Sequence, residues 1–474
     1  MRTRFLDTCN LDSPKGLRLA LLAIALLPTL RIPSEAQTFN TLYAFTGESS
    51  AYPTSLTKGR DSKLYGAASG QSVFGFAGEA FDVTTAGNFV PLHLFDVSHG
   101  SDPTGGVLLS TDGAFYGTTP SGGSAGQFGY GVLYRLTPSG QFAVIHNFAG
   151  GAEGAYPFAP PIEASDGNLY GTTAGAPGFG STIYRYDSSG NFTTLVQLQQ
   201  SQGANIVAPL VQGSDGDLYG VAQAGGTQNC GSIFKLTSAG TLLYARSFPC
   251  GFGGSYPNGP LVQAPDGNFY GTTDAGGSRA AVFGTIFRMT PAGVLSRLHN
   301  FQGAPNDGAY PIGPLTLATD GNLYGATPSG GASYSGSIFK ISTSGAYTQL
   351  YSFNLNEAFG AGYALIQDTS GLLYGTSQEG GPNGVGTVYS FDMGFGPFIT
   401  FVLPSGKVAQ EAQILGQGLT GATSVTFNGT AASFSVTSDT FMTAVVPSGA
   451  TTGKVVVTTP GGTLTSNVNF RILQ

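Results

Sequence analysis

Asp166-Gly167-Asn168-Leu169-Tyr170-Gly171 is a six-residue phrase that this chain repeats with small variations. Its copies are DSKLYG at 61–66, DGAFYG at 112–117, DGNLYG at 166–171 and 320–325, DGDLYG at 215–220, DGNFYG at 266–271, and DTSGLLYG at 368–375. The last copy is interpreted as two residues longer than the others. The tyrosines recur about every 50 residues, a period that indicates tandem supersecondary units.

The fifth copy shows what each unit contains. Four short segments, 259–264, 268–273, 284–290 and 294–301, have alternating or continuous apolar patterns, as β-strands do. We name them strands a to d. Asp-Gly between a and b, and Pro-Ala-Gly between c and d, tolerate the backbone conformations that tight hairpins require. Four antiparallel strands in about 50 residues are typical of one blade of a β-propeller.

The last unit lacks its own strand d. Segments 363–367, 372–376 and 386–391 supply strands a, b and c, and the period then stops. The missing pattern lies at 39–45, near the start of the chain. We therefore predict an all-β chain with a seven-bladed β-propeller over 37–394, closed by an N-terminal strand, because closure removes exposed sheet edges. An open β-solenoid is the alternative, but it gives no reason to divide one repeat between the two ends.

The full repeat pattern is D-G-N-L-Y-G-T-T, G-G, G-T/S-I-F-K/R-L and L-H-x-F. It resembles the Gly-rich tandem repeats of secreted bacterial proteins known as GloVer repeats, over about three quarters of the chain. The resemblance implies a location and an architecture, and it implies no chemistry.

Residues 395–474 follow a different β pattern, with short alternating strands about ten residues apart, which predicts a small sandwich. The segments ILGQGL (414–419), VTFNGT (425–430) and VPSGATTGKVVV (446–457) resemble the IPT/TIG domain, an immunoglobulin-like β-sandwich. That resemblance implies a spacer or contact surface on an extracellular protein.

Composition limits the classes of function. Of 474 residues, 74 are Gly, charged residues make up 9%, and the net charge is −7. No basic patch is present to meet phosphates, so we expect no nucleic-acid partner. Residues 1–36 are interpreted as a signal peptide, with basic residues before the apolar run 19–27 and with Ser34 and Ala36 before the cleavage point. We predict a secreted, extracellular or cell-surface protein with no transmembrane segment after signal removal.

Cys230 and Cys250 flank the c–d hairpin of the fourth unit, with Gly240 midway. Antiparallel pairing brings the two cysteines together, and secretion favours a disulfide. Two free thiols or a metal pair are the alternative, although no histidine lies nearby. The repeated aspartates are interpreted as turn residues that accept backbone hydrogen bonds. The histidines lack zinc-site spacing, and we expect no metal and no cofactor.

The b–c and d–a loops vary between copies, whereas the a–b and c–d turns are short and uniform. Both variable loop types should emerge on one face, where a repeat protein presents a binding surface. The candidate binding residues are the tyrosines of a recurrent Tyr-Pro and the acids near them: Tyr52, Tyr156, Tyr256, Tyr310, Glu48, Asp102, Glu153, Asp307 and Glu357. The other interpretation is that Tyr-Pro only shapes the entry to strand a.

Taken together, the sequence predicts a non-enzymatic binding or adhesion protein whose partner is a glycan, a cell-wall fragment or a protein. The alternative is a carbohydrate-active enzyme, a lyase or glycoside hydrolase, that uses carboxylates of the variable loops. A third hypothesis is a structural adhesion protein whose partner binds residues 395–474.

Overall fold

The computed structural model describes residues 37–47, 51–70, 77–124, 129–175, 180–278, 282–362 and 365–474. The predicted signal peptide and Glu48 lie outside these residues. The described chain is all-β apart from two short 3-10 turns, η3 (Gly151–Glu153) and η4 (Gly251–Gly253). In the described part, no helix has the length and apolar character needed to cross a membrane.

Seven four-stranded antiparallel sheets follow one another over the described residues between 38 and 392. We number them repeat sheets 1 to 7, and each runs in the order a-b-c-d. Sheet 1 contains β2 (Pro53–Lys58), β3 (Lys63–Ala68), β4 (Glu79–Thr84) and β5 (Phe89–Leu94). Sheet 2 contains β6 (Val107–Leu109), β7 (Phe115–Thr119), β8 (Val132–Leu136) and β9 (Phe142–Asn147). Sheet 3 contains β10 (Ile162–Glu163), β11 (Leu169–Thr173), β12 (Thr182–Tyr186) and β13 (Phe192–Gln197).

The remaining sheets repeat this plan. Sheet 4 contains β14 (Val211–Gln212), β15 (Leu218–Ala222), β16 (Ser232–Leu236) and β17 (Leu242–Ser247). Sheet 5 contains β18 (Val262–Gln263), β19 (Phe269–Thr273), β20 (Thr285–Met289) and β21 (Leu295–Asn300). Sheet 6 contains β23 (Thr316–Leu317), β24 (Leu323–Thr327), β26 (Ser337–Ile341) and β27 (Tyr347–Ser352), and a small pair, β22 (Gly308–Ala309) with β25 (Ser329–Gly330), lies in its loops.

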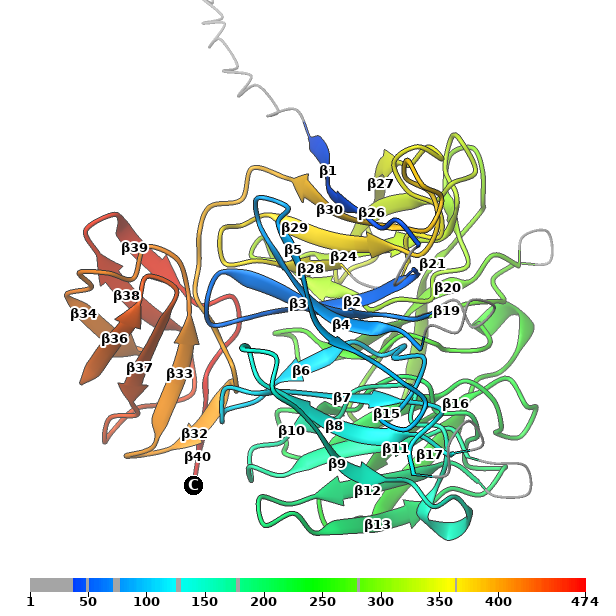
Figure 1. Ribbon diagram of the computed structural model, residues 1–474, viewed down its shortest axis with the longest axis horizontal. Coiled ribbons are helices and arrows are strands. Elements are labelled where there is room, and N and C mark those ends of the chain that lie inside the picture. The colour runs from blue at the N-terminus through cyan, green and yellow to red at the C-terminus, as the bar shows by residue number, and fades with distance from the viewer. Residues whose placement is uncertain are drawn as a thin grey trace, which may run out of the picture. The chain divides into compact units, whose positions relative to one another are not determined.

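Sheet 7 combines the two ends of the repeat region. It contains β28 (Leu365–Gln367), β29 (Leu373–Ser377), β30 (Thr387–Asp392) and, as its strand d, β1 (Thr38–Ala44). Figure 1 shows β1 lying beside β30, and the register runs antiparallel from Thr38↔Asp392 to Ala44↔Thr387. The prediction that the N-terminal strand completes the last sheet is confirmed.

In four of the seven repeat sheets a threonine on strand b bonds its sheet to the next one. Thr118 and Thr172 donate to the carbonyls of Ala159 and Ala208, at 2.9 and 3.4 Å, and Thr272 and Gly313 form the same contact between sheets 5 and 6. Thr376 of sheet 7 donates in the same way to Thr54 of sheet 1. The sheets therefore form a closed, propeller-like ring whose innermost elements are the a strands.

The seventh a–b hairpin requires a correction. Asp368 donates its N–H to the carbonyl of Leu372 at 2.8 Å, as Ala164 does to Asn168 at 3.0 Å in sheet 3. Asp368 therefore occupies the position of Ala164, and Ser370 takes the place of the motif aspartate. The prediction that this copy is two residues longer is wrong, because the hairpin keeps its length and carries its aspartate two positions earlier.

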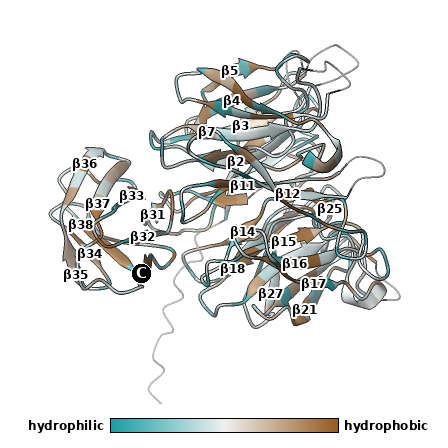
Figure 2. Cartoon of the chain, turned by 90° about the horizontal axis from the view of Figure 1, so that it is seen from below, coloured by the Kyte–Doolittle hydropathy of each residue, from teal (hydrophilic) through white to brown (hydrophobic). Residues whose placement is uncertain are grey.

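The C-terminal residues form two further four-stranded sheets. One contains β31 (Thr400–Phe401), β33 (Glu411–Leu415), β37 (Phe441–Val445) and β36 (Phe434–Ser438). The other contains β35 (Thr430–Ala432), β34 (Ser424–Phe427), β38 (Val455–Thr459) and β39 (Gly462–Thr465), and β32 (Ser405–Lys407) pairs in parallel with β40 (Arg471–Leu473). The two sheets share one buried core that includes Ile414, Val457 and Phe470. In Figure 2 the apolar colour within this part lies mainly on its strands.

Candidate ligand-binding channel and loop face

The motif aspartates hold the a–b turns. Asp166 accepts the N–H of Asn168 at 3.1 Å through Oδ1 and the hydroxyl of Tyr170 at 2.7 Å through Oδ2. Burial, together with this carboxylate, raises the pKa of Tyr170 to about 12. The same Asp–Tyr bond joins Asp61 to Tyr65, Asp215 to Tyr219, Asp266 to Tyr270, and Asp320 to Tyr324. The sequence interpretation missed the tyrosine hydroxyl, although the constant four-residue spacing of Asp and Tyr in the first six copies could have indicated it.

The tyrosines of Tyr-Pro share an unusual backbone conformation. Tyr52, Tyr156, Tyr256 and Tyr310 have φ between 58° and 60°, and Asp102 and Asn205 take the same place at 59° and 55°. This left-handed conformation costs a side-chain-bearing residue roughly 1–2 kcal/mol. In this conformation the N–H of Tyr256 donates to the carbonyl of Cys230 in the preceding sheet at 3.0 Å. The carbonyl of Tyr256 accepts the N–H of Asp274 at 3.1 Å. The backbone at this position therefore bonds one sheet to its neighbour.

The proline that follows packs against a glycine of the preceding sheet. A Cβ on Gly231 would lie 2.5 Å from Cδ of Pro257, and one on Gly284 would lie 2.7 Å from Cδ of Pro311. This contact supports the interpretation that Tyr-Pro shapes the entry to strand a.

Two of these tyrosine side chains are exposed, whereas those of Tyr52 and Tyr156 are partly buried. Tyr256 is 40% exposed and Tyr310 is 38% exposed. The ring of Tyr310 lies edge-on to Phe283 of the preceding b–c loop at 5.5 Å. The backbone and the side chain of this position therefore have separate roles, one within the ring and one at its surface.

The d–a and b–c loops share one face, as predicted. Isolated backbone bridges join them within a repeat, at Ser101↔Ser121, Ala204↔Ala224, Ser255↔Ala275 and Phe359↔Glu379. We call this surface the loop face, and we call the opposite surface, which carries the a–b and c–d turns, the turn face.

The candidate acids on the loop face bind their own loops. Glu153 accepts the N–H of Ala149 at 2.7 Å and lies 2.9 Å from Nε2 of His146. Burial lowers the pKa of His146, although the nearby Glu153 carboxylate acts in the opposite direction. Glu357 accepts the hydroxyl of Tyr351 at 2.8 Å and the N–H of Asn354 at 3.2 Å.

Asp307 is the most enclosed of these acids. It is 5% exposed, accepts the hydroxyl of Tyr347 at 2.6 Å and the N–H of Gln302 at 2.9 Å, and lies 3.0 Å from Nε2 of His299. Asp102 is half-buried, and burial raises its pKa. Glu153, Asp307 and Glu357 thus close loops against strand d of the preceding sheet, whereas Asp102 accepts the hydroxyl of Ser121 in the b–c loop of its own sheet at 3.5 Å. The prediction that these acids bind a ligand stays a prediction.

Cys230 and Cys250 form a disulfide bond, with 5.5 Å between their Cα atoms, across the c–d hairpin of sheet 4. Because the carbonyl of Cys230 accepts the N–H of Tyr256, the disulfide also stabilises the contact between sheets 4 and 5. Among the described residues no group of three or more His, Cys, Asp or Glu side chains has the geometry of a metal site.

A channel of about 380 Å³ lies inside the ring, where the segments that lead into the a strands of six sheets meet. Its wall contains the hydroxyls of Ser55, Thr57 and Thr104, the amide of Asn258, and otherwise backbone and apolar side chains. The apolar wall residues are Val107, Phe158, Ala159, Pro160, Val207, Ala208, Pro209, Pro260, Ile312 and Pro314. Among the described residues that line it there is no ionisable side chain. The sequence analysis did not identify this channel, because it treated these segments only as entries to strand a.

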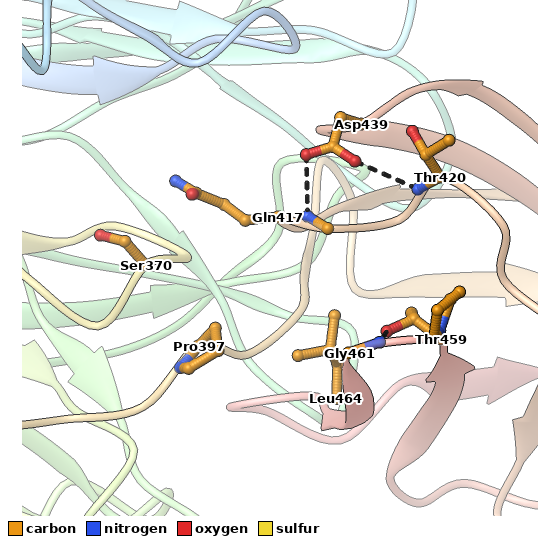
Figure 3. A pocket seen from close by; sticks show the side chains of 10 residues that line it. Ser370, Pro397, Gln417, Thr420, Asp439, Thr459, Gly461 and Leu464 are labelled. Carbon is orange, nitrogen blue, oxygen red and sulfur yellow. Dashed lines mark hydrogen bonds between the residues drawn. The ribbon is translucent and has the colours of Figure 1, made fainter.

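Two further hollows involve the turn face and the C-terminal residues. One, of about 590 Å³, lies between the turns of sheets 3 to 6 and residues such as Ser405 and Arg471. Figure 3 shows the other, of about 550 Å³, in which Asp439 accepts the N–H groups of Gly418 and Thr420 at 3.0 and 3.2 Å. Hydrogen bonding by the Thr420 side chain, together with these two backbone bonds, lowers the pKa of Asp439. Its carboxylate stabilises the 418–420 turn.

The ring, its repeated turns and its variable loop face define an all-β tandem-repeat protein. The chain belongs to the Gloeobacter/Verrucomicrobia repeat family, whose model matches residues 124–306 and 279–442.

No curated protein matches the chain. Among solved structures, it is similar to a putative 6-phosphogluconolactonase from Bacteroides fragilis, with 16% identity, a TM-score of 0.46, and coverage of 68% of this chain and 90% of that one. A gluconolactonase from Xanthomonas campestris shows 13% identity, a TM-score of 0.39, and coverage of 75% and 89%. A luciferin-regenerating enzyme shows 13% identity, a TM-score of 0.40, and coverage of 76% and 98%. At these identities no activity is transferred to this chain.

Proposed function

We propose that this chain is a secreted or cell-surface, non-enzymatic binding protein. It consists of a signal peptide (1–36), a seven-bladed β-propeller (37–394) and an immunoglobulin-like module of the IPT/TIG type (395–474). The described seven-sheet ring and the two-sheet C-terminal core support this division. Its ligand surface is the loop face, with the mouth of the channel at the centre.

The channel is the observation that carries the proposal. A concave, mainly apolar site with a few convergent polar groups is typical of small-molecule binding in proteins. Six sheets contribute to its wall, so its shape depends on the whole ring.

The loop face supports a binding role beyond the channel. Large apolar side chains are exposed there on loops of sheets 4 to 7, and exposed apolar groups that gather on one face mark interaction sites. They are Tyr256 (40% exposed), Val282 (56%), Tyr310 (38%), Tyr334 (70%) and Leu355 (62%). Tyrosine supplies contact area with little loss of conformational entropy.

The contacts of the loop acids favour binding over catalysis. A glycoside hydrolase needs two carboxyl groups that both reach the substrate. Glu153, Asp307 and Glu357 instead accept hydrogen bonds from their own loops and from strand d side chains.

Binding can be tested with the chain from residue 37 to 474 on an array of glycans and cell-wall fragments. V207W fills the channel, and V90W is the matched control, because Val90 is 44% exposed on β5. We expect a bound ligand that V207W abolishes and V90W leaves unchanged, with both variants melting like the parent. Binding that V207W leaves intact, or no binding at all, would overturn the proposal. Turnover of a polysaccharide that E153Q, D307N and E357Q abolish would replace it with the enzyme alternative.

A further inference from the structure

Three amide side chains form a hydrogen-bonded row that ends in the channel. Asn205 donates through Nδ2 to Oε1 of Gln223, which donates through Nε2 to Oδ1 of Asn258 at 2.5 Å. Asn258 lines the channel, and its own Nδ2 donates no hydrogen bond within the described chain. One hydrogen-bonding group of the channel wall is therefore open to a ligand.

This row departs from the repeat. The residue in the place of Asn258 is threonine in sheets 1 and 2 and apolar in sheets 3, 4 and 6: Thr54, Thr104, Phe158, Val207 and Ile312. Asn205 likewise stands where most repeats have tyrosine, and asparagine adopts its φ of 55° with less strain. Gln223, at the end of strand b, joins the two asparagines across the boundary between sheets 4 and 5. Architecture alone does not require amides at these places, since the other sheets form without them.

The other polar side chains of the wall already have partners. Ser55 donates to the carbonyl of Gly105 at 2.8 Å, Thr104 donates to that of Phe158 at 3.2 Å, and the hydroxyl of Thr57 bonds to the next sheet in the same way. These hydroxyls retain lone pairs that can accept a hydrogen bond. Asn258 is therefore the side chain of the wall that can donate one.

The wall also restricts the charge of the ligand. None of its described side chains is ionisable, and a charged group that leaves water without a counter-charge loses several kcal/mol of hydration. Amide groups in a row can reverse direction together, so Asn258 can present either Nδ2 or Oδ1. A hydroxyl group, which both donates and accepts, matches either arrangement. Val207, Ile312 and the wall prolines offer apolar surface to the C–H faces of a ring.

We propose that the channel binds one uncharged sugar unit and that Asn258 is the specificity-determining residue, which hydrogen-bonds a hydroxyl or acetamido group of that sugar. This proposal rests on the function proposed above and names its ligand class. The channel volume of about 380 Å³ lies near the lower end of small-molecule pockets, which span roughly 300–1,000 Å³, and so suits a small ligand.

Titration calorimetry of the 37–474 chain with glucose, N-acetylglucosamine and glucuronate tests this proposal. We expect at least one neutral sugar to bind, and glucuronate to bind at least about tenfold more weakly. N258L should weaken binding of the neutral sugar about fivefold to tenfold, as expected for one lost hydrogen bond between uncharged groups. N356L, an Asn→Leu change at an exposed loop-face position, is the matched control and should bind like the parent.

The outcomes separate the two proposals. If glucuronate binds as tightly as glucose, or N258L keeps full affinity while V207W abolishes binding, the sugar proposal is overturned and the binding function stands. If the array finds a ligand that is not a sugar, and V207W abolishes its binding, the sugar proposal is likewise overturned and the binding function stands. If V207W changes the binding of no ligand, the channel is not the site and both proposals fall.

Discussion

The ion pair between Lys58 and Asp368 predicts large changes in the free energy of unfolding when either residue is replaced. Lys58 ends β2, and its Nζ lies 2.6 Å from Oδ1 of Asp368 in the a–b turn of sheet 7. The two side chains are 9% and 0% exposed. In three other sheets the same place is held by a neutral amide, and Gln212, for example, accepts the N–H of Ser165 at 2.9 Å. The boundary that closes the ring, between sheets 7 and 1, therefore uses a buried ion pair where its neighbours use a hydrogen bond.

Removing one partner of a buried ion pair costs about 3–5 kcal/mol, because the other charge stays buried. Asp368 also accepts the N–H of Ser370 and Nε2 of Gln417, both at 3.0 Å. We therefore expect K58Q to cost about 3 kcal/mol, the lower end of that range. D368A should cost about 5 kcal/mol, because within the described residues the Lys58 ammonium contacts no polar partner other than Asp368.

The double variant K58Q/D368A separates charge burial from a general loss of packing. It reproduces the arrangement at Gln212, where Ala164 precedes the N–H that the glutamine accepts. We expect its free energy of unfolding to lie within about 1 kcal/mol of the parent, the net value of one hydrogen bond. Urea unfolding followed by tyrosine fluorescence measures this, since the chain has no tryptophan. A double variant as unstable as D368A would refute the reasoning.

Three further predictions concern single positions. G231A should cost about 2–3 kcal/mol of unfolding free energy, because its Cβ would lie 2.5 Å from Pro257, whereas G216A, with a similar φ and no atom within 4 Å, should cost about 1 kcal/mol in the same urea assay. Burial lowers the pKa of His93, so on acidification the imidazole is protonated more readily in the unfolded chain than in the folded one. The free energy of unfolding should therefore fall as the pH drops below about 6.5. Thermal melts from pH 7.5 to 5 should show a smaller fall in melting temperature for H93Q than for the parent. Replacing both disulfide cysteines, which are 20 residues apart, by alanine should lower the free energy of unfolding by about 3 kcal/mol, and equal melting temperatures with and without the bond would contradict this.

The repeat itself made most of the fold predictable. Seven Tyr-Gly pairs at nearly constant spacing located the b strands, and the missing last strand d indicated that 39–45 would pair with 386–391, as β1 and β30 do. The wrong length predicted for the seventh copy has a local cause: Asp368 resembles the motif aspartate, although Ser370 occupies that position. The a–b turn of sheet 7 has the same backbone hydrogen bond as the turn of sheet 3, but its motif position holds serine instead of aspartate.

The candidate site was less predictable, because sequence does not show which polar groups already have partners. The sequence places Glu153 and Asp307 on the variable loops near Tyr-Pro, yet each binds a histidine seven or eight residues earlier on strand d. That spacing was visible in the sequence, but its meaning depends on a strand and a loop folding back onto one face. The channel wall gave no local pattern at all, since its residues come from six different repeats. Asn258 could have been found only by comparing the repeats position by position and asking which residue breaks the series.

The two ends of the ring differ, and this difference bears on how a ligand enters. On the turn face, Arg60 of sheet 1 donates to Gln413 at 2.5 Å and lies 4.6 Å from the ring centre of Phe441. Thr369 of sheet 7 donates to Gly416 at 3.1 Å, and Arg471 donates to Gly213 of sheet 4 at 2.7 Å. C-terminal residues thus bond to sheets on several sides of the ring at its turn face. We therefore expect ligands to enter from the loop face, and the C-terminal part to contribute to binding by supporting the ring rather than by contacting the ligand. Accordingly, Q413A and Q417A together should lower the melting temperature while leaving sugar affinity at a temperature well below the melt unchanged; a loss of affinity in the folded double variant would place the C-terminal residues in the binding site itself.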